Sequence, residues 1–75
     1  MAKMILFENE WIRINPLNKY KIEYSINDGI DWKIRYLGSD CGKFEELNKK
    51  EVELLATTTK GIYISKNKGI TWIKM

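Results

Sequence analysis

Histidine is absent from this 75-residue chain, and cysteine occurs once, at Cys41. One cysteine cannot form a disulfide within the chain, and without histidine it cannot build a tetrahedral zinc site. Neither a serine–histidine nor a cysteine–histidine nucleophile is available. We therefore expect Cys41 to be a free, buried or half-buried thiol. We also expect that the protein is not an enzyme and that it has no catalytic residues, no metal and no cofactor.

Long apolar runs and strong charge are also missing. The apolar stretch at residues 4–7 is too short for a secretory signal or a membrane span, and Glu8 follows it at once. The chain has 13 Lys and Arg against 10 Asp and Glu, a net charge of +3. A nucleic-acid surface normally needs a stronger basic cluster. We expect a cytoplasmic protein with no membrane contact and no nucleic-acid partner. Four lysines gather near the second hairpin, and we interpret them as solvent-exposed residues that protect its edge from pairing with another chain: Lys60, Lys66, Lys68 and Lys74.

Alternation of apolar and polar residues, the period of a half-buried strand, dominates the chain. In residues 32–36 it predicts Trp32, Ile34 and Tyr36 on one face and the two cations on the other. The segments predicted as strands by alternation or by β-forming apolar runs are 11–14, 20–24, 32–36, 54–57 and 62–64. Residues 44–54 include helix formers, but we predict strand-turn-strand there because residues 4–14, which match them, alternate. The fold class is therefore all-β, with about eight strands.

An eight-residue segment occurs twice. Residues 25–32, Ser-Ile-Asn-Asp-Gly-Ile-Asp-Trp, return 40 residues later as residues 65–72, Ser-Lys-Asn-Lys-Gly-Ile-Thr-Trp. Five of the eight residues are identical, and the same ungapped offset pairs apolar residues outside the segment, such as Ile22 with Ile62. Periods of this size are typical of four-stranded propeller blades. We predict a single domain, residues 1–75, made of two tandem repeats at about 1–37 and 41–75.

The repeated segment resembles the Asp-box, or BNR repeat, whose pattern is Ser/Thr-x-Asp-x-Gly-x-Thr-Trp. That family includes sialidases, sortilin-type receptors and plant photosystem assembly factors, in which the box usually joins the third and fourth strands of a propeller blade. Asn27 and Asn67 stand where the family usually has Asp. The resemblance does not extend to sialidase activity, because the arginine cluster that those enzymes share is not matched by Arg13 and Arg35.

The box residues are predicted to be structural. The Asn side chain accepts hydrogen bonds from backbone N–H groups two residues on. Glycine supplies a positive φ, serine ends the incoming strand, and tryptophan returns the chain to the core. The residues assigned these roles are Ser25, Asn27, Gly29 and Trp32, with Ser65, Asn67, Gly69 and Trp72.

Two blades cannot close a propeller, which needs at least four. We therefore predict two four-stranded antiparallel blade-like repeats in one of two arrangements. Either the chain is a homo-oligomer, in which two or three copies complete a ring, or the two sheets pack as a small sandwich or barrel around Trp11, Trp32 and Trp72. We favour association, because so short a chain buries little surface alone.

Four positions break the repeat and are the candidate binding residues. The offset pairs Trp11 with Glu51, Arg13 with Glu53, Tyr20 with Lys60 and Arg35 with Met75. A tryptophan with a glutamate counterpart need not be core, and aromatics beside arginines are typical of binding hot spots. The competing interpretation is that Trp11 closes one end of the core.

These observations predict a non-enzymatic binding module for a protein or a small polar ligand. One alternative is a lectin-like blade pair that stacks glycans on Trp11 and Tyr20. The other is a small inhibitor of a host complex, encoded by a virus or mobile element, since the Lys-, Asn- and Ile-rich composition is compatible with such an origin.

Overall fold

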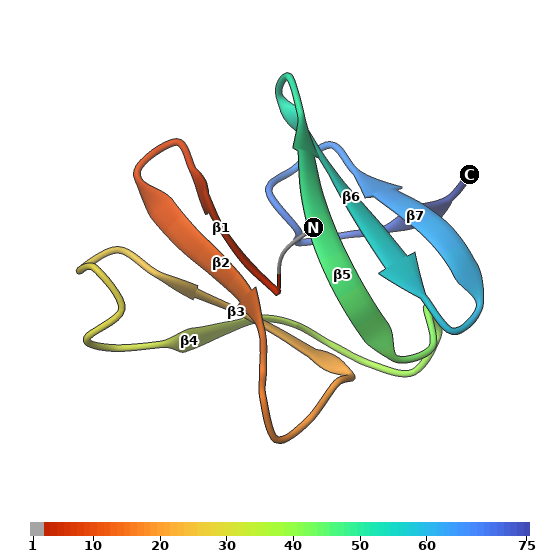
Figure 1. Cartoon of the computed structure of the whole chain (residues 1–75), viewed down its shortest axis with the longest axis horizontal. Coiled ribbons are helices and arrows are strands. Elements are labelled where there is room, and N and C mark those ends of the chain that lie inside the picture. The colour runs from red at the N-terminus through yellow and green to blue at the C-terminus, as the bar shows by residue number, and fades with distance from the viewer. Residues whose placement is uncertain (1–2) are drawn as a thin grey trace.

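The structure, a computed structural model, describes residues 3–75, and the regular elements in that range are all β-strands (Figure 1). They form two four-stranded antiparallel sheets, in the orders β1-β2-β3-β4 and β5-β6-β7-β8. The strands are β1 (Met4–Phe7), β2 (Glu10–Ile14), β3 (Lys21–Ser25), β4 (Lys33–Leu37), β5 (Phe44–Lys50), β6 (Glu53–Thr58), β7 (Gly61–Ser65) and β8 (Ile73–Lys74). The predicted all-β fold with two four-stranded sheets is confirmed. Within residues 3–75 no helix is long and apolar enough to cross a membrane.

Each sheet has two faces, because successive side chains of a strand point to opposite sides. We call the face that includes the box serine, Ser25 or Ser65, the box face, and the other the rear face. The core lies between the rear face of the first sheet and the box face of the second. Figure 1 shows β5 as the strand of the second sheet that lies against β1 and β2. The two sheets therefore stack head to tail, with unlike faces in contact.

Buried apolar residues of both repeats fill this interface. From the first sheet come Phe7, Ile12, Ile14 and Ile22, from the second Phe44, Leu47, Leu54, Ala56 and Tyr63, and Cys41 joins them from the linker. The Phe44 ring packs against Tyr36, with ring centroids 5.7 Å apart, and against Trp72, with centroids 5.4 Å apart. Cys41 is a free thiol and is only 2% exposed. Phe44 is thus the residue through which the linker, the first sheet and the second box meet.

The ungapped repeat is wrong across β2 and β6. Trp11 pairs with Ser25, whereas Ser65 pairs with Leu54, so the counterpart of Trp11 is Leu54 rather than Glu51. Glu51 instead has a φ of 56° in the tight turn between β5 and β6. The physical reason is length: β5 has 7 residues where β1 has 4, so the second hairpin turns later in its repeat.

Of the faces predicted for residues 32–36, that of Tyr36 is wrong, whereas Trp32 and Ile34 share the box face as expected. Ile22 pairs with Tyr36 but Glu23 pairs with Ile34, so the ladder shifts by one residue and Arg35 is the extra one. A bulge of this kind reverses the alternation along the strand. Tyr36 therefore lies on the rear face and Ile34 on the box face.

Tyr36 gives the fold a measurable dependence on alkaline pH. Burial raises the pKa of Tyr36 from 10.0 to about 12, and its hydrogen bond with Cys41 acts in the same direction. The unfolded chain loses the tyrosine proton first as pH rises, so this contribution to stability is complete below pH 10 and is lost towards pH 12. In urea unfolding across this range, we expect wild type to lose stability relative to Tyr36→Phe. Parallel curves for the two proteins would contradict the assignment.

Candidate binding site

Both boxes fold through the same hydrogen bonds. Ser25 Oγ accepts the Gly29 N–H at 2.8 Å and donates to Asn27 Oδ1 at 2.8 Å. Asn27 Oδ1 also accepts the N–H of Asp31 at 2.9 Å. The second box repeats all three bonds at 2.8, 2.9 and 2.9 Å. We predicted that the Asn side chain accepts the N–H group two residues later in the chain. It accepts the N–H group four residues later instead, because the serine hydroxyl accepts the nearer N–H groups.

The two glycines have the conformation expected of them, with φ values of 85° at Gly29 and 95° at Gly69. A side chain at either position would be strained at such angles. The predicted structural roles of the box serines, asparagines and glycines therefore have a direct basis in the loop geometry.

The side-chain amide explains why asparagine rather than aspartate stands at positions 27 and 67. Asn27 Nδ2 donates to Asp31 Oδ2 at 2.9 Å, and Asn67 Nδ2 donates to Thr71 Oγ1 at 2.8 Å. A carboxylate cannot donate either bond. In the first box the acceptor is itself a carboxylate, so the amide is required there more strictly than in the second.

We expect Asn27→Asp to cost about 2 kcal/mol at neutral pH, because it replaces a charge-assisted hydrogen bond with two facing carboxylates. Asn67→Asp should cost less than about 0.5 kcal/mol, because the Thr71 hydroxyl can donate to the new carboxylate. Thermal melts of the two variants measure the difference. Equal losses at neutral pH would contradict this account.

The two box tryptophans lie in different surroundings. Trp72 packs against the core, as expected. Trp32 is half-buried like Trp72, but it lies on the box face of the first sheet, where the Arg13 guanidinium carbon is 4.0 Å from the centroid of its ring. The expectation that Trp32 returns to the core is therefore wrong. The cause is the head-to-tail stacking, which covers the box face of the second sheet and leaves that of the first free.

A hollow on this free face gathers two of the four candidate binding residues. Trp11, Arg13 and Trp32 line it, together with Met4, Asp28 and Gly29. Arg13 Nε donates to Glu23 Oε1 at 2.9 Å, which fixes the guanidinium over the Trp32 ring. An aromatic plane beside a fixed guanidinium can bind a carboxylate, a phosphate or another aromatic group.

The other two candidates lie elsewhere. Tyr20 lines a separate hollow formed by the loop between β2 and β3. Arg35 lies between the sheets, where Nη2 contacts Glu10 Oε1 at 3.0 Å and Nη1 donates to the Lys68 carbonyl at 3.1 Å. Its guanidinium carbon is 3.8 Å from the centroid of the Tyr24 ring. The geometry at Arg35 is that of an inter-sheet clamp.

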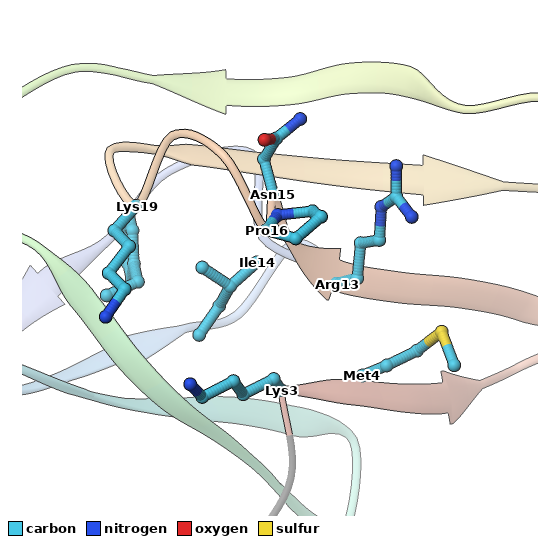
Figure 2. A pocket seen from close by; sticks show the side chains of 8 residues that line it. Lys3, Met4, Arg13, Ile14, Asn15, Pro16 and Lys19 are labelled. Atoms are coloured by element: carbon cyan, nitrogen blue, oxygen red, sulfur yellow. The ribbon is translucent and has the colours of Figure 1, made fainter.

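A third hollow, of about 240 Å³, lies where the loop after β2 approaches β1 (Figure 2). Its lining includes Lys3, Arg13, Lys19 and the buried Phe44, and no carboxylate is among the described residues that line it. Figure 2 shows the Lys3 and Lys19 side chains ending on one side of Ile14, while Arg13 points away from them. The two ammonium groups thus give this hollow a positive character.

Comparisons with protein-family models, with curated proteins and with solved structures found no match to this chain.

Proposed function

We propose that this chain is a non-enzymatic protein-binding module, whose free box face on the first sheet contacts the partner. One observation supports this above others: Arg13 is stacked on Trp32 at 4.0 Å and tied to Glu23 at 2.9 Å. A side chain that is already ordered loses little entropy on binding, and Trp and Arg are the residues most enriched at hot spots.

The two boxes with one hydrogen-bond scheme also support kinship with the Asp-box repeat proteins, and hence a blade-like identity for each sheet. We infer that the module acts in the cytoplasm, since its one cysteine is a buried free thiol, and that it is a homo-oligomer. Oligomerisation is the available way for two blade-like sheets to cover their free faces.

Partner capture with matched variants tests the binding face. Trp32→Ala removes the aromatic plane, and Arg13→Lys keeps a cation near Glu23 but removes the planar stack. We expect both variants to keep a wild-type circular dichroism spectrum and to reduce capture of a partner from the native host at least about tenfold, the scale of one hot-spot contact. Leu17→Ala, at a loop residue that is 97% exposed, is the control and should capture as wild type does. Equal capture by all variants would show that the binding face lies elsewhere.

The aromatic lining of the same hollow favours a second candidate, a lectin-like module that stacks a sugar ring on Trp11 or Trp32. A glycan array separates the candidates. Glycan binding that disappears in Trp11→Ala would replace the protein-binding proposal.

A further inference from the structure

The rear face of the second sheet carries a row of apolar side chains with nothing packed on it within residues 3–75. Leu55, Ile64 and Ile73 pair directly across β6, β7 and β8, and Ile62 lies in the next row. Ile62 is 50% exposed and Ile73 is 60% exposed. We call these four residues the isoleucine patch. A contiguous apolar row on a sheet face is typical of an interaction surface.

The first sheet shows what such a face packs against. Strand register makes Ile12 the counterpart of Leu55, Ile22 that of Ile62 and Tyr24 that of Ile64. Ile12 and Ile22 are both 0% exposed, because the box face of the second sheet covers them. The same face of the repeat is therefore covered in the first sheet and free in the second.

The reverse holds for the box faces. In the second sheet, Leu54 and Ala56 are 0% exposed under the first sheet. Their counterparts in the first sheet, Trp11 and Arg13, lie on the free box face beside Leu6, which is 51% exposed. The chain thus makes one junction between a rear face and a box face, and it exposes one more face of each kind.

We infer that the free box face of the first sheet binds the isoleucine patch of a second copy of this chain, continuing the head-to-tail stack. The inference rests on the proposed function, because it names the partner of that same face. Such an interface is heterologous and closes into a ring if the rotation permits. Two or three copies give four or six sheets, within the range of closed propellers.

The repeat also indicates that this junction differs from the one within the chain. Arg35 is the extra residue of the bulge in β4, whereas β8 pairs with β7 without a register shift, so β8 holds no counterpart of Arg35. The clamp that Arg35 forms with Glu10 is therefore not repeated between copies. The junction between copies is centred on the isoleucine patch of one copy and on Trp11, Arg13 and Trp32 of the other.

Light scattering after size exclusion tests the inference on the intact chain. We expect wild type at two or three times 8.9 kDa. Ile62→Glu combined with Ile73→Glu should give a folded monomer, because both side chains are exposed within one chain. Leu17→Glu places the same charge on a loop and should leave the oligomer intact. A wild-type monomer, or an oligomer that survives the double variant, would overturn the inference.

Mixing two blocked variants tests the head-to-tail arrangement. Leu6→Glu blocks the box face and should also give a monomer. In an equimolar mixture with the Ile62/Ile73 variant, one intact face of each kind remains, so we expect a dimer of one copy of each. No dimer in the mixture would show that unlike faces do not meet. If wild type is monomeric and still captures a partner that Trp32→Ala does not, the inference fails and the proposed function stands.

Discussion

The Trp72→Ala variant is expected to lose about 3–5 kcal/mol of unfolding free energy, the cost of truncating a packed aromatic side chain to alanine. Trp72 contacts Phe44 at the junction of the two sheets, so its removal opens the interface on which each sheet depends. A loss of this size is a large part of the total stability of a small domain. Urea unfolding followed by circular dichroism measures it.

Two further variants test whether lost packing is the cause of the stability loss in Trp72→Ala. Trp72→Phe should recover most of the stability, because the buried Trp72 Nε1 has no hydrogen-bond partner within residues 3–75. Trp32→Ala should cost about 1 kcal/mol, the value of an exposed cation–π contact, although it holds the same place in its box. Equal losses for the two Trp→Ala variants would show that the two boxes are not in different surroundings.

The Arg35→Ala variant is expected to lose about 3 kcal/mol, at the lower end of the cost of breaking a buried ion pair. The Arg35 side chain is 9% exposed, and Glu10, at 21%, would be left without its partner. The Lys68 carbonyl would also lose the bond that joins the second box to the first sheet. Chemical denaturation measures the loss.

Lys33→Ala is the matched control, since it removes an exposed cation from the same strand. It should change stability by less than about 0.5 kcal/mol. If Arg35→Ala proved as stable as Lys33→Ala while partner capture fell, Arg35 would be a binding residue, as its place in the repeat suggested.

The sequence was sufficient for the β class and for the two boxes, because alternation and turn residues are local signals. The sequence did not fully predict which residues share a face of each sheet. Whether Trp11 matches Glu51 or Leu54 depends on where the β5–β6 hairpin turns, and several turn positions satisfy the same apolar pattern. Whether Ile34 and Tyr36 share a face depends on the bulge at Arg35, which no glycine or proline marks.

The sequence predicted part of the candidate site, because only some of its residues are placed by local signals. Trp11 and Arg13 lie two apart on one strand, so alternation alone puts them on one face. The sequence predicts a core position for Trp32 because it holds the same place in its box as Trp72, but only Trp72 packs against the core. Identical residues in a tandem repeat have identical surroundings only if both copies have the same neighbours. Head-to-tail stacking leaves the box face of the first sheet and the rear face of the second sheet without the neighbours that the matching faces have.

The order of the strands has a consequence for the speed of folding. Every strand in residues 3–75 pairs with its neighbour in the chain, so each sheet can form through hairpins that close short loops. Proteins with such local pairings fold towards the fast end for all-β domains. The long-range step is the docking of β5 on β1 and β2, in which the Phe44 N–H donates to the Lys19 carbonyl at 2.8 Å. Docking follows the pairing of the strands within each sheet. Substitutions at Phe44 should therefore change the unfolding rate more than the folding rate.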